Sequence, residues 1–121
     1  MAKRVRITAE HLKGVEPHPI ILKHVTEIFR RMFPSTPPSA FVPDLKVRAP
    51  YDDNAWGALG DDISNMAWMK LLKVRLSHRE MLLVSTIKEL AVLISLKAGR
   101  AVGRLSGAEF AHVSDVNLTA A

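Results

Sequence analysis

The segment from Met81 to Leu96 is apolar on nearly every side, and it limits the possible folds more than any other part of the chain. Only Lys88, Glu89 and small hydroxyl residues interrupt it. A helix that is apolar all round has no face for water, so it has to be buried. Because a chain of 121 residues has much surface for its volume, we expect complete burial of this helix to need a neighbouring subunit.

The ends of this apolar helix are marked by capping signatures. Ser77 and Glu80 have the spacing of a capping box, which predicts that the helix begins at His78. A second signature, Ser106 with Glu109, competes with simple continuation of the helix. The helix therefore either continues through that point or stops near Arg104, with a short fourth helix after it.

Two further helices are predicted upstream. The first runs from about Pro19 to Phe33, where Pro34 stops it, and its apolar stripe consists of Ile21, Val25, Ile28 and Met32. The second starts at a cap formed by Asp61 or Asp62 and ends near Leu76.

The remaining segments are predicted to be extended or turned. Residues 1–17 form a basic arm and a turn that Thr8 caps and Gly14 ends. Residues 34–60 form a proline-rich and acidic connector. We therefore expect residues 1–121 to be a single all-α domain, a small bundle of three main helices plus a short C-terminal helix.

The charge of the chain is unevenly distributed around a net value of +5. Residues 1–6 carry three basic groups, whereas residues 44–62 carry five aspartates against two basic groups. Residues 63–106 carry eight basic groups against Glu80 and Glu89 alone. A net positive charge favours an anionic partner such as nucleic acid.

The basic side chains of the second half have a helical spacing. If residues 75–104 form one helix, five basic side chains share a face, because each residue turns the helix by 100°. Guanidinium groups on one face suit phosphate oxygens, which predicts duplex nucleic acid held through its backbone. The alternative is a solvated face that keeps the chain soluble. The predicted contacts, with those of the arm, are Lys3, Arg4, Arg6, Arg75, Arg79, Lys97, Arg100 and Arg104.

Small residues recur at every fourth position near the C-terminus. On a helix such residues form a groove that admits a second backbone, and helical glycine costs about 1 kcal/mol relative to alanine. The ladder predicts a contact between subunits of a homo-oligomer. Packing within one chain, or termination of the helix at Gly99, are the alternatives. The predicted interface residues are Ala91, Ser95, Gly99, Gly103 and Gly107.

Catalysis is not indicated by the residue pattern. The absence of cysteine excludes thiolate metal sites and a cysteine nucleophile. The five histidines are scattered, and each is expected to be a surface or cap residue. Adjacent aspartates before a helix are typical of caps and turns more than of a cation site. We therefore predict no enzyme, no cofactor and no metal.

These patterns together predict a structural subunit that self-assembles into an oligomer or filament and coats nucleic acid, as in a capsid or nucleocapsid. A dimeric helical DNA-binding regulator and an accessory subunit of a larger complex are the alternatives. The chain contains no run of 18 uncharged apolar residues, so no membrane span is predicted. We therefore expect the chain in the cytoplasm or in a virion-like particle. The absence of Gln and Cys hints at a thermophilic source.

Overall fold

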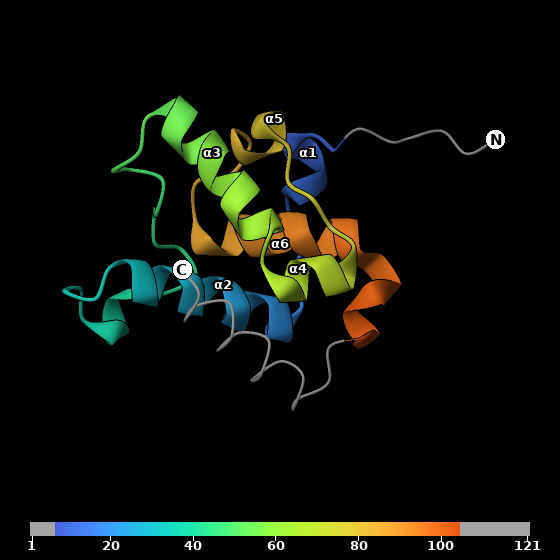
Figure 1. The fold of residues 1–121 in the computed structure, drawn as a ribbon, viewed down its shortest axis with the longest axis horizontal. Helices are drawn as coiled ribbons and strands as arrows, with labels where there is room; N and C mark the ends of the chain where they lie inside the picture. Colours follow the sequence, from blue (N-terminus) through green and yellow to red (C-terminus); the bar gives the residue numbers. More distant parts are fainter. Residues whose placement is uncertain (1–6, 105–121) are drawn as a thin grey trace.

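The computed structural model describes residues 7–104, with the backbone alone for Gly103 and Arg104 (Figure 1). Within that range the predicted all-α fold is confirmed: the regular elements are helices, and one isolated antiparallel bridge joins Lys46 to Thr86. The α-helices are α1 (Ala9–Leu12), α2 (Pro19–Met32), α3 (Asp53–Ser64), α4 (Ala67–Leu72), α5 (His78–Met81) and α6 (Ile87–Ala98). Two 3-10 helices are η1 (Pro38–Ala40) and η2 (Gly99–Arg104).

Helix α2 begins where the sequence predicts. Pro19 occupies the first turn, and the Nδ1 atom of His18 accepts a hydrogen bond from the Ile20 amide. The buried face contains Ile21, Val25 and Ile28 as expected, together with Phe29 and His24, whereas Met32 of the predicted stripe is exposed. This face packs on α6, so the two helices form the main layer of the core (Figure 1).

The connector is shorter than predicted, because α3 begins at Asp53, inside the predicted range 34–60. Asp52 is the actual cap: its Oδ1 atom accepts a hydrogen bond from the Ala55 amide at 2.7 Å. The prediction that Asp61 or Asp62 caps this helix is therefore wrong, and both lie in its last turn. The sequence misleads here because Gly57 and Gly60 resemble turn residues.

Those two glycines have a packing role within α3. A Cβ atom on Gly57 would lie 2.1 Å from the ring of His78, and one on Gly60 would lie 2.5 Å from Cγ of Met81. Both contacted residues belong to α5. The absence of side chains thus lets α5 lie directly against α3, where Trp56 donates a hydrogen bond from Nε1 to the Met81 carbonyl.

The prediction of one continuous helix from Asp61 or Asp62 to Leu76 is also wrong. It is divided into α3 and α4 at Asn65 and Met66, and α4 ends when Lys73 takes a left-handed conformation. Residues 73–77 then run across to α5. Buried Ser64 fastens this segment, because its Oγ atom donates to the Gly60 carbonyl and accepts from the Leu76 amide, both at 2.7 Å.

The predicted third helix is two helices. The Ser77 capping box is confirmed, but α5 ends after Met81. Thr86 and Glu89 form a second capping box that starts α6, and the predicted helix did not include a break at this box. Separate caps allow the chain to turn between the two helices, so an apolar run that resembles one helix is folded back on the core.

Helix α6 is buried by its own chain. Leu90, Leu93 and Ile94 have no exposed surface, with α2 on one side and α1 also in contact. These residues therefore need no neighbouring subunit to be buried, contrary to the expectation from the sequence. Leu96 alone among the apolar side chains of α6 is counted as exposed, at 39%.

The two ends of the chain were predicted to carry an extended arm and a short fourth helix. The arm (residues 1–6) and the helix from Ser106 lie outside the described residues. The turn between the arm and α2 matches its prediction, because α1 follows Thr8 and Gly14 has a positive φ of 70°.

Candidate nucleic-acid interface

Between Ile63 and Val102 every exposed charged side chain is basic. The two acids in this stretch are half-buried and engaged in local hydrogen bonds. Glu80 accepts from the Ser77 amide, and Oε1 of Glu89 accepts from the amides of Ser85 and Thr86. Their charges thus serve the capping of α5 and α6 and leave the surface positive.

Five exposed side chains make up what we call the basic surface. None of them forms an ion pair with another described residue. Three were predicted contacts, whereas the two lysines on α4 and at its end were missed because the predicted basic face began at Arg75. The signal that identifies them is their position in a stretch without exposed acids. The members are Lys70, Lys73, Arg75, Arg79 and Arg100.

The members of the basic surface come from α4, the segment after it, α5 and η2. Helix α4 contacts η2, which carries Arg100 (Figure 1). The Lys97 ammonium, near the end of α6, donates to the Arg75 carbonyl and to Glu80. That ammonium therefore holds the Arg75 segment and α5 against the C-terminal end of α6.

Lys97 is one of the predicted phosphate contacts, but in the structure its charge is used within the chain. Only 22% of its side chain is exposed, and it pairs with Glu80. Burial alone would raise the pKa of Glu80, but hydrogen bonds from Lys97 and Ser77 outweigh burial and lower that pKa. The pair thus stays ionised at neutral pH and acts as a support for the basic surface.

The prediction that residues 75–104 form one helix with a single basic face is wrong, because a loop separates α5 from α6. Arg75 lies before α5, Arg79 within it, and Arg100 in η2. The side chain of Arg104 and the basic residues Lys3, Arg4 and Arg6 lie outside what the structure describes.

The predicted interface ladder is also divided. Ala91 is fully buried in the core, and Oγ of Ser95 accepts from the His18 amide at 3.0 Å, so both pack within the chain. Gly99 ends α6 with a φ of 53°, and Gly103 follows in η2. The ladder is therefore not one helical ridge, and Gly107 lies outside the described residues.

Large aromatic side chains are buried rather than displayed. Trp56 and Trp68 are 0% and 1% exposed. The ring of His24 stacks on Trp68, with centroids 4.3 Å apart and planes inclined by 8°. Its burial contradicts the expectation of a surface or cap residue. Burial, with a smaller contribution from the charge of Lys23, lowers the pKa of His24 to about 3, so the ring is neutral.

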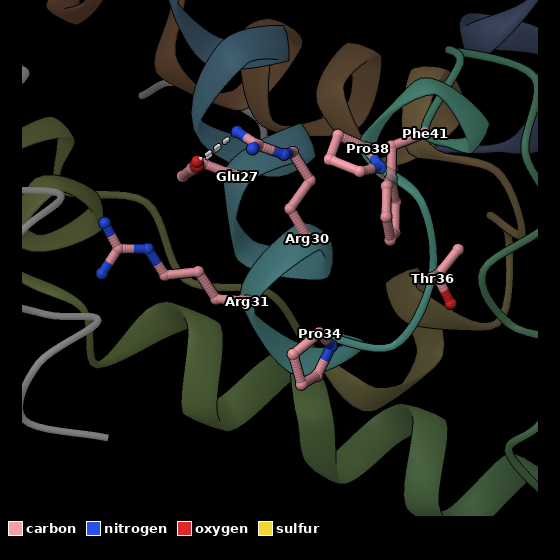
Figure 2. A pocket seen from close by; sticks show the side chains of 7 residues that line it. All are labelled: Glu27, Arg30, Arg31, Pro34, Thr36, Pro38 and Phe41. Atoms are coloured by element: carbon pink, nitrogen blue, oxygen red, sulfur yellow. Dashed lines mark hydrogen bonds and ion pairs between the residues drawn. The ribbon is translucent and has the colours of Figure 1, made fainter.

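A cavity of about 290 Å³ lies between the end of α2 and the proline-rich turn (Figure 2). Arg30 points toward Glu27 in this view and binds both of its carboxylate oxygens, at 2.8 and 3.0 Å, whereas Arg31 extends away from Phe41. Because Glu27 balances Arg30, the cavity has no concentrated charge. The chain between residues 7 and 104 also contains no cluster of three His, Asp or Glu side chains fit to hold a metal ion.

A scan of family models and searches of curated proteins and of solved structures found no match to this chain. No helix in the described range is long and apolar enough to cross a bilayer. The basic surface is thus the feature of the described residues that points to a partner.

Proposed function

We propose that this chain is a non-enzymatic structural subunit that contacts the phosphates of duplex nucleic acid through its basic surface, as part of a homo-oligomeric coat. The observation that carries the proposal is that residues 63–102 expose charge of one sign, because every exposed ionised side chain there is Lys or Arg. Phosphate contacts of this kind do not depend on base sequence.

The residue types suit phosphate groups. Arg75, Arg79 and Arg100 present planar guanidinium groups, which bind phosphate oxygens bidentately. No described acid lies exposed among them to neutralise their charge. None of them pairs with an acid among the described residues, so no such ion pair explains their placement.

A duplex suits this surface better than a single strand. Proteins that hold single strands stack the bases on exposed aromatic rings. Both tryptophans are buried here, and Phe33 and Tyr51 pack edge-on against each other, with ring centroids 6.5 Å apart. Contacts to the phosphates of a continuous backbone remain as the available mode of binding.

The coat part of the proposal concerns the surface at the end of α6. Ala91 and Ser95 are used within the chain, which leaves Gly99 on the surface, with no atom within 4 Å of the position of a Cβ, beside the exposed Leu96. An exposed leucine next to a bare backbone is a surface against which a second copy can pack closely.

A regulator that inserts a recognition helix is less well supported. Such a helix would begin at His78, but α5 is only four residues long. The first turn of α6 is covered by the connector, since the Ile87 and Lys88 amides donate to the Leu45 and Pro43 carbonyls. Neither helix has a free first turn to place in a major groove.

The first experiment measures the native mass and the ratio of absorbance at 260 and 280 nm on gel filtration at low and high salt. The proposal predicts a large species rich in nucleic acid that releases it as salt rises. A monomer free of nucleic acid at both salt concentrations would contradict the proposal and favour an accessory subunit that binds another protein.

Charge reversal then tests the surface itself. The double variant Arg75→Glu, Arg79→Glu should lose at least 100-fold in affinity for a 20-base-pair duplex. The matched control, Lys13→Glu with Lys46→Glu, makes the same change in net charge at exposed positions outside the basic surface. Equal losses in the two variants would show that net charge matters and the basic surface does not.

A further inference from the structure

Helix α4 ends in a conformation that normally requires glycine. Lys73 has φ 58° and ψ 40°, in the left-handed region. The turn is closed by hydrogen bonds from the Lys73 amide to the Lys70 carbonyl and from the Val74 amide to the Met69 carbonyl, at 3.0 and 3.1 Å. This is the Schellman arrangement, in which glycine is the usual residue because a Cβ atom is disfavoured there.

The other left-handed positions obey that rule. The described chain has positive φ at three residues, and two of them, Gly14 and Gly99, are glycine. Lys73 is the exception, so its side chain is kept at a conformational cost. A strained residue of this kind is a reason to look for a function of its side chain.

No contact within the described residues explains the lysine. Its side chain is exposed, and it forms no hydrogen bond or ion pair with another described residue. Lys70 lies one turn earlier and Arg75 two residues later, both exposed and both positive.

We propose that Lys73 is a phosphate-binding residue, retained for its ammonium group at the expense of stability, and that with Lys70 it extends the basic surface along α4. The inference rests on the proposed function, because it assigns these lysines to the same duplex. The left-handed turn directs the chain from α4 toward Arg75, so Lys73 stands between the lysine of the helix and the arginines beyond it.

The substitution Lys73→Gly gives two readouts of opposite sign. Glycine relieves the left-handed strain, so the Tm should rise by about 2–5 °C. Loss of the ammonium should weaken binding to a 20-base-pair DNA duplex about three- to tenfold at low salt and reduce the slope of log K against log salt by about 1. A residue with a merely structural role would not change that slope.

Two matched variants isolate the charge. Lys73→Arg retains the positive charge and should keep both the affinity and the salt slope. Lys13→Gly removes an exposed lysine outside the basic surface and should leave the salt slope unchanged. The same measurements on a double-stranded RNA of equal length should show the same loss, because both duplexes present phosphodiesters.

The outcomes separate the two proposals. A raised Tm with an unchanged salt slope in Lys73→Gly would overturn the assignment of Lys73, and so would a loss confined to one of the two duplexes. A fall in Tm would overturn the argument that lysine is strained here. If Arg75→Glu with Arg79→Glu also binds normally, the proposed function fails as a whole.

Discussion

Helix α3 and the basic surface share one core but carry opposite charges. The outer side of α3 exposes Asp53, Asp61 and Asp62, whereas the exposed charged side chains of α4 and the segment after it are all lysine or arginine. Both regions bury apolar faces in the same cluster, including Trp56 from α3 and Trp68 from α4. Burial therefore does not determine where each charge lies.

In both regions some charges occupy locally unfavourable positions. Asp61 and Asp62 lie in the last turn of α3, where the helix dipole is negative, and Lys73 lies in a left-handed turn. Residues selected for folding alone would avoid such positions. The comparison shows that charged side chains in both regions lie where the local backbone does not favour them, and four experiments test how the two regions are held and charged.

The largest expected effect comes from cutting the hydrogen bond that ties α3 to the segment after α4. Ser64→Ala leaves the Leu76 amide, which is in a residue only 2% exposed, without its acceptor. An unsatisfied buried donor costs about 1–3 kcal/mol. Urea unfolding should show this loss, and Ser39→Ala at an exposed position should show none. Equal stability of the two variants would mean that Ser64 does not hold the regions together.

The attachment of α4 to α2 should depend on pH. His24, stacked on Trp68, has a folded-state pKa of about 3 against about 6.5 when unfolded. As pH falls below 6.5 the unfolded chain takes up the proton first, so stability present at pH 7 is lost progressively toward pH 3. The expected loss at pH 5 is about 2 kcal/mol.

A His24→Phe variant provides the control for this pH effect. Phenylalanine keeps a ring against Trp68 but does not titrate. The difference in unfolding free energy between pH 7 and pH 5 should therefore shrink by about 2 kcal/mol in the variant. An identical pH dependence in the two proteins would show that another group causes it.

The attachment of α5 to α3 should distinguish two glycines. In Gly60→Ala the new Cβ would meet the fully buried Met81, which has nowhere to move, and we expect a loss of about 1–2 kcal/mol. In Gly57→Ala it meets the exposed ring of His78, which can swing into solvent. The helix propensity of alanine, about 1 kcal/mol above glycine, should then keep that variant near wild-type stability. Thermal unfolding of both variants decides the point, and the reverse ranking would contradict it.

The smallest effect tests the charge placement on α3 directly. Replacing Asp61 and Asp62 by Asn should raise stability by about 0.5 kcal/mol at low salt, because two negative charges leave the negative end of the helix. Asp53→Asn, in the first turn, should lower stability by a few tenths of a kcal/mol, through the helix dipole and through loss of the ion pair with Arg48. Chemical denaturation at two salt concentrations measures both, and the same sign in both variants would rule out the dipole explanation.

Local signals in the sequence are sufficient for parts of the fold. Pro19 with the stripe of apolar residues after it predicts α2 almost to the residue, and Ser77 with Glu80 predicts the start of α5. The excess of basic residues in the second half predicts which part of the chain is positive. Caps, periodicity and net charge depend on neighbours along the chain, so they can be read without the structure.

Three features depended on contacts between distant residues. Gly57 and Gly60 lie within α3 because α5 packs where their side chains would be, and the start of α6 after the apolar run is fixed by hydrogen bonds from the Ile87 and Lys88 amides to carbonyls of the connector. Lys97 is withdrawn from the basic surface because Glu80 lies beside it.

The sequence by itself determined that this chain is helical, basic in its second half and without the motifs of a known catalyst. Only the tertiary structure decided which basic groups stay on the surface, where Lys73 enters its left-handed turn, and that α6 is buried by its own chain. The physical reason is that burial and pairing are properties of surfaces brought together by folding, whereas composition and periodicity are properties of the chain.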